Sequence, residues 1–155
     1  MLACSDAVAV FLHGIACYAS GFAFTLEVTY RYEPPEDEEP RHHPLGMWGP
    51  RPREGADRFG IGYSDGRRAT LDERHPPQPP SSTGPLTILQ GGGHGGRGHY
   101  SGELWVQPLP PPGPVTFAVE WAAEAIDETL ATSEGERFAA AAKRSERIFP
   151  PRRRS

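Results

Sequence analysis

The chain has 155 residues and a net charge of −4 at pH 7, which suits one domain with a single core and argues against a surface built to bind nucleic acid. Its 18 glycines and 18 prolines predict that a large share of the chain forms loops. No apolar run reaches the roughly 18 residues that a transmembrane helix needs. We therefore expect neither a nucleic acid nor a membrane as a partner.

Proline divides the chain into segments. Because proline lacks the N–H that a strand ladder needs, regular structure is expected between the proline clusters. We predict a single β-rich domain over residues 1–150, with long proline-rich loops at 33–58 and 72–85, and a basic tail at 151–155.

Two features near the N-terminus bear on location. Leu2-Ala3-Cys4 resembles a lipoprotein cleavage site, but such a site needs a basic and an apolar segment before it. Only Met1 precedes these residues, so a surface-anchored protein would require a start codon further upstream. Cys4 and Cys17 form neither a C-x-x-C motif nor a disulfide framework. We expect reduced thiols in a cytoplasmic protein.

Three segments carry the clearest strand patterns. In "FAFTLEVTYRY" (22–32) and "VTFAVEW" (115–121), apolar and aromatic residues stand at every second position, which predicts half-buried strands. The segment "DAVAVFLHGI" (6–15) is apolar on both faces, which is typical of a strand covered on both sides.

Shorter strands are expected between these. "RFGIGYSDGRRATLD" (58–72) predicts a hairpin, because Asp65-Gly66 accepts the positive φ angles of a tight turn. "LTILQ" (86–90) and "SGELWVQ" (101–107) predict two more strands, one on each side of a glycine-rich stretch.

The hydrophobic period changes near the C-terminus. Ser133 and Glu136 match a capping box, and Phe138, Ala142 and Phe149 follow helical spacing, which together predict a helix over about 134–147. A succession of strands followed by one helix indicates a mainly β protein. We predict an antiparallel β-sandwich-like fold of roughly six to eight strands with one C-terminal α-helix.

The glycine-rich stretch "GGGHGGRGHY" (91–100) contains G-x-G-x-x-G, which in dinucleotide-binding proteins opens a helix that holds the pyrophosphate. Here a strand follows, and the Gly-Lys-Ser/Thr of a Walker A loop is missing. We interpret the stretch as a mobile connection between two strands. One alternative stays open: a loop that binds an anion or another small ligand through Arg67, His94, Arg97 and His99.

Histidine offers a second candidate chemistry. His42, His43, His94 and His99 all fall in predicted loops, and both cysteines are distant in sequence. Zinc needs three or four fixed ligands, so we expect no metal and no cofactor.

Nucleophilic and acid–base catalysis have little support. The sequence contains no G-x-S-x-G motif, and Ser64 is followed by Asp65 in a predicted turn rather than by a catalytic partner. Glu120 and Glu124 flank Trp121, but nothing fixes their separation. No catalytic residue is assigned.

Trp105 is a candidate contact for a partner. In "ELWVQ" it shares one strand face with Glu103 and Gln107. If that face points away from the core, the ring lies on a polar surface, where large aromatic residues anchor protein partners. The competing interpretation is that the C-terminal helix covers the ring with Phe138 and Phe149.

Four segments follow one another in a characteristic order: "VAVFLHGIACYASGFAFTLEV", "FGIGYSDGRR", a glycine-rich connection, and "LWVQPLPPPGPVTFAVEWAAEAI" before a short helix. In this order they resemble a family of small uncharacterised actinobacterial proteins, and "PLPPPGP" before a strand ending in "EW" is the most specific part. The resemblance covers nearly the whole chain and implies that residues 1–6 are the lead-in to the domain. It implies no activity and no catalytic or binding residue.

Two functional hypotheses follow. The first is a non-catalytic cytoplasmic domain that acts by protein–protein interaction or self-association. The second is a small-ligand-binding or anion-binding protein, or an enzyme, whose site is formed by the 91–100 loop.

Overall fold

The computed structural model describes residues 1–32, 45, 57–71 and 83–146. Most of the predicted loops at 33–58 and 72–85 therefore lies outside the described residues. The predicted tail at 151–155 lies wholly outside them. No helix in the described part is long and apolar enough to cross a membrane.

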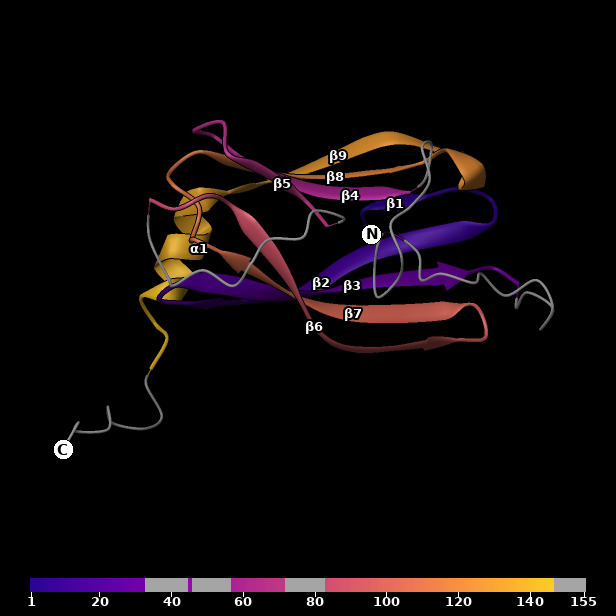
Figure 1. Ribbon diagram of the computed structural model, residues 1–155, viewed down its shortest axis with the longest axis horizontal. Helices are drawn as coiled ribbons and strands as arrows, with labels where there is room; N and C mark the ends of the chain where they lie inside the picture. Colours follow the sequence, from indigo (N-terminus) through magenta and orange to yellow (C-terminus); the bar gives the residue numbers. More distant parts are fainter. Residues whose placement is uncertain (33–44, 46–56, 72–82, 147–155) are drawn as a thin grey trace.

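Two antiparallel sheets form the two layers of a β-sandwich (Figure 1). The first sheet consists, in spatial order, of β1 (Ala3–Cys4), β2 (Val8–Tyr18), β3 (Gly21–Tyr30), β7 (His99–Gln107) and β6 (Thr87–Gly96). The second consists of β5 (Arg68–Thr70), β4 (Arg58–Tyr63), β8 (Pro114–Trp121) and β9 (Ile126–Glu134). A short 3₁₀ helix, Ala122–Glu124, joins β8 to β9, and α1 (Gly135–Ala142) follows β9.

The core lies between the sheets and is built by alternation along the strands. On β3 the side chains of Phe22, Phe24, Leu26 and Val28 are at most 1% exposed, because every second residue points inward. The ring of Phe24 bridges the layers, with its centroid 5.8 Å from that of Phe59 on β4. The predicted mainly β, antiparallel sandwich-like fold is confirmed.

The structure describes nine strands, more than the sequence predicted. The hairpin at Asp65-Gly66 is present as β4 and β5, and Gly66 has a φ of +89°. β1 has only two residues, too few to show a period. β9 was not predicted, because "IDETLATSE" contains too few apolar residues to alternate visibly.

The interpretation of 91–100 as a mobile connection was wrong. Strand β6 runs through the glycines to Gly96, and the connection is a two-residue turn at Arg97 and Gly98. Both turn residues have positive φ angles, 53° and 73°, as in the type I′ turn that matches the twist of paired strands. Glycine has a low strand propensity, but pairing with the strongly patterned β7 overrides it.

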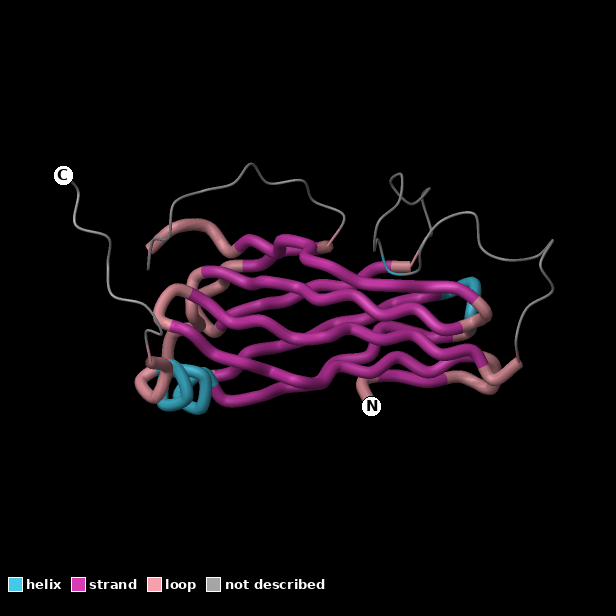
Figure 2. Tube along the Cα trace, turned by 90° about the horizontal axis from the view of Figure 1, so that it is seen from below, coloured by secondary structure: helices cyan, strands magenta, loops and turns pink. Residues whose placement is uncertain are grey.

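The C-terminal helix is shorter than predicted and is not capped as predicted. Ser133 belongs to β9, and α1 begins after Glu134 without a side-chain cap. The Glu136 carboxylate instead accepts a hydrogen bond from the N–H of Gly113, at 3.1 Å. Figure 2 shows α1 at one end of the sandwich, where the Phe138 ring packs edge-on against Phe22 at 4.7 Å.

Candidate functional site

The outer face of the five-stranded sheet gathers polar side chains from four strands. His13 on β2, Glu27 and Thr29 on β3, His99 on β7 and His94 on β6 lie on this face, because each alternates with a residue that points into the core. We call these five residues the histidine face. Sequence analysis singled out His94 and His99 but missed the other three.

The histidine face is held together by hydrogen bonds and ring contacts. His13 Nε2 lies 3.0 Å from Glu27 Oε2, and His99 Nδ1 lies 3.2 Å from Thr29 Oγ1 and 3.9 Å from Glu27 Oε1. The rings of His94 and His99 are 5.7 Å apart. The Glu27 carboxylate therefore lies between two imidazoles that reach it from neighbouring strands.

The five residues of the histidine face form a hydrogen-bonding surface. Within residues 1–32, 45, 57–71 and 83–146, no group of three or more His, Cys, Asp and Glu side chains is placed to hold a metal ion. His13 and His99 keep 53% and 41% of their side chains exposed. A partner that approaches this face thus meets imidazole nitrogens directly.

Trp105 lies on the same outer face, nearer the end that carries α1. Its ring packs over Gly21 and beside Tyr18, 5.7 Å between centroids, and its indole N–H donates to Gln107 Oε1 at 3.1 Å. An added Cβ at Gly21 would come within 2.7 Å of the ring, so the glycine makes the space that the indole fills. Trp105 is half-buried by its own sheet.

The interpretation that the C-terminal helix covers Trp105 was wrong for the part of the helix that the structure describes. Phe138 packs on Phe22, and Phe22 points into the core, whereas Trp105 points away from it. The other residue invoked for that cover, Phe149, lies outside the described residues.

The four residues of the proposed anion loop do not come together. His94 and His99 are neighbours across β6 and β7, and Arg97 forms the turn between these strands. Arg67 lies in the β4–β5 turn, next to the β4 end that pairs with the start of β8. Its guanidinium is held by an ion pair with Asp65 at 2.7 Å and a hydrogen bond to the Gly84 carbonyl oxygen at 3.0 Å.

The other candidates considered from sequence have structural roles or lie outside the described residues. The Ser64 hydroxyl donates to the Pro112 carbonyl oxygen at 2.7 Å, and Glu120 is exposed on β8. Partial burial raises the pKa of Glu124. His42 and His43 fall among the residues that are not described.

Strand β6 forms one border of the sheet and supplies the second part of the candidate site. In the described part of the chain, β6 pairs only with β7, and residues 91–95 are exposed. Alternate residues of an antiparallel strand direct their N–H and C=O groups to opposite sides. The Gly96–His99 pair closes the turn, so the backbone groups of Gly96 and His94 point toward β7. We therefore expect the backbone groups of Gly93 and Gly95 to point toward the open edge.

Comparison of the chain with protein-family models, curated proteins and solved structures gives no match in any of the three.

Proposed function

We propose that the chain is a non-catalytic domain that self-associates through the open edge of β6. Two copies would pair their β6 strands antiparallel, which joins two five-stranded sheets into one continuous sheet across the interface. The histidine face would lie directly beside the new strand pair.

The observation that carries this proposal is the contrast between β6 and the other sheet borders in the described part of the chain. β1 and β5 are only two and three residues long, and β9 carries Asp127, Glu128 and Glu134. Short length, charge and bulges are the usual protections of an edge strand against pairing, and of these β6 has only the irregularity between Gln90 and Gly93. β6 has ten residues, "TILQGGGHGG", without a charged residue or a proline.

The glycines also favour a second copy of this chain as the occupant. An added Cβ at Gly92 meets nothing within 4 Å, so the edge is open around this residue. In a pairing centred on Gly93, each His94 would lie opposite Gly92 of the second copy, where there is room for the imidazole. The His94 ring of each copy would thus face a glycine rather than another side chain.

The expected association is weak. Each backbone hydrogen bond contributes about 0.5–1.5 kcal/mol net, while association costs at least about 4 kcal/mol of rigid-body freedom. About six such bonds give at most roughly 9 kcal/mol, which leaves no more than about 5 kcal/mol after that cost. The dissociation constant is therefore expected at about 0.2 mM or weaker.

Sedimentation velocity over about 10 µM to 1 mM protein tests the proposal. We expect the wild type to shift from monomer to dimer with concentration. Gly92→Lys, which places a charge at the edge in open space, should remain monomeric. Ala140→Lys, on the exposed side of α1, makes the same charge change and should dimerise like the wild type. A wild type that is monomeric at the highest concentration would overturn the proposal.

The free cysteines suit a reducing compartment. Cys4 and Cys17 are unpaired, and Cys4 is exposed. Since exposed thiols persist in the cytoplasm and not in oxidising compartments, we propose that the protein acts in the cytoplasm.

A further inference from the structure

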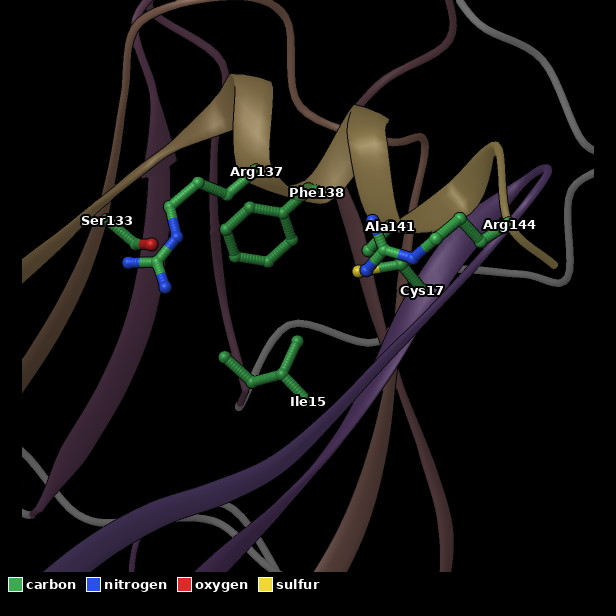
Figure 3. A pocket seen from close by; sticks show the side chains of 7 residues that line it. All are labelled: Ile15, Cys17, Ser133, Arg137, Phe138, Ala141 and Arg144. Carbon is green, nitrogen blue, oxygen red and sulfur yellow. The ribbon is translucent and has the colours of Figure 1, made fainter.

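A cavity of about 330 Å³ lies between α1 and the end of β2 (Figure 3). Cys17 is opposite Phe22, which points into the core, whereas Trp105 is opposite Ala23, so the cavity and Trp105 lie on opposite sides of the sheet. The lining of the cavity consists of Ile15, Cys17, Ser133, Arg137, Phe138, Ala141 and Arg144. This volume is in the range of small-molecule sites, which are typically about 300–1,000 Å³.

A bulge in β2 turns two of the lining residues toward α1. His13 is opposite Thr25 and Ala16 is opposite Ala23, so β2 has one more residue than β3 in this interval. Gly14, with a φ of +66°, absorbs the extra residue. Because a one-residue shift reverses which face a side chain takes, Ile15 and then Cys17 face α1 instead of the outer surface.

The cavity combines an apolar floor with two cations. The Phe138 ring and Ile15 lie between the two arginines, with Arg137 extending beside Ser133 and Arg144 beside Cys17 (Figure 3). Ile15 is 43% exposed. A large apolar side chain is therefore partly uncovered at the mouth of the cavity. An apolar ligand that covered Ile15 would gain the free energy of removing that surface from water.

Two positive charges line the cavity, one from Arg137 and one from Arg144. Among the described residues, no carboxylate forms an ion pair with Arg137 or Arg144. Arg144 also donates a hydrogen bond from one nitrogen to the Ala140 carbonyl oxygen, at 3.3 Å. Burial raises the pKa of the Cys17 thiol while the Arg144 charge opposes that rise, so the floor is partly dehydrated and lies in the field of a cation.

We propose that this cavity binds a small amphipathic carboxylate, with a medium-length unbranched alkyl chain on the floor formed by Ile15 and Phe138. The carboxylate is held at the rim by the guanidinium of Arg137 or Arg144, a pairing that matches the fork of the arginine side chain. The chain as a whole is acidic, with a net charge of −4, so the positive rim is a local property of this cavity. The proposal is independent of pairing at β6.

Isothermal titration calorimetry with decanoate tests it on the full chain. We expect decanoate to bind saturably at one site. Decanol, which lacks the charge, should bind at least about tenfold more weakly, and acetate, which lacks the alkyl tail, should not bind. Arg137→Gln or Arg144→Gln should weaken decanoate binding about tenfold, according to which arginine holds the carboxylate. Arg58→Gln removes the same charge at the exposed start of β4 and should leave the affinity unchanged.

Cysteine alkylation gives a second readout in the same samples. Decanoate should slow the reaction of Cys17 with iodoacetamide and leave exposed Cys4 unaffected. Absence of saturable binding up to about 1 mM decanoate would overturn the proposal. Equal affinity in all three arginine variants, or equal protection of both cysteines, would also overturn it, because either result means adsorption elsewhere on the protein.

Discussion

Gly135, the first residue of α1, should not tolerate a side chain. An added Cβ would overlap the Pro111 carbonyl oxygen and lie 3.0 Å from the Gly113 carbonyl oxygen. The Gly135 N–H also donates to that Gly113 oxygen at 2.7 Å. Alanine would therefore force the helix and the loop apart by about 1 Å, which costs roughly 1–3 kcal/mol in strain and about 1 kcal/mol in the weakened hydrogen bond.

We expect Gly135→Ala to lower the free energy of unfolding by about 3 kcal/mol, which corresponds to a fall in Tm of roughly 6–12 °C for a chain of this size. Urea unfolding followed by far-UV circular dichroism measures the change. Gly92→Ala is the matched control, because its Cβ meets nothing within 4 Å, and its stability should be equal or higher. A Gly135→Ala variant as stable as the control would refute the close approach of α1 to the 108–113 connection.

Three further outcomes are expected. Trp105→Ala should lower the free energy of unfolding by about 2 kcal/mol, measured in urea, whereas a loss below about 0.5 kcal/mol would mean that the ring is not packed. Burial raises the pKa of the Tyr30 and Tyr63 phenols above the ordinary 10.0. Because the unfolded chain then ionises at a lower pH than the folded one, the free energy of unfolding should fall as the pH rises above about 10. The double variant Tyr30→Phe, Tyr63→Phe should show a smaller fall in urea titrations across that range. The raised pKa of Cys17 should make it react with iodoacetamide more slowly than exposed Cys4 at pH 8, as measured by peptide mass spectrometry.

The sandwich could be predicted because its long strands alternate strictly. The pattern in 22–32 placed Phe24 and Leu26 on one face, and both are buried, as period two requires. β9 could not be predicted, because an edge strand that is exposed along most of its length needs few apolar residues. The extent of β6 was missed for a different reason: pairing with β7, a long-range effect, decides the conformation of a glycine run whose own propensity is low.

The candidate site was only partly accessible from sequence. His94 and His99 were recognised because they sit close together in a distinctive stretch, whereas their neighbours His13 and Glu27 come from a different hairpin. Strand order brings them together, and strand order follows from pairing that no local pattern records. The signal that was present is the polar face of 22–32, since Glu27 and Thr29 had to point away from the core.

The use of glycine in β6 is informative because not every glycine there is required by the backbone. Gly96 has a φ of +138°, and a Cβ at Gly91 would lie 3.2 Å from the Glu103 carbonyl oxygen. The local backbone therefore favours glycine at both positions. Gly92 has neither constraint, and glycine inside a strand sacrifices roughly 0.5–1 kcal/mol relative to alanine. Gly92 also lies in the irregularity of β6 between Gln90 and Gly93, and glycine is common at such bulges. Under the pairing proposed for β6, Gly92 would in addition leave room for the His94 ring of a second copy, because a larger side chain at this position would occupy that space.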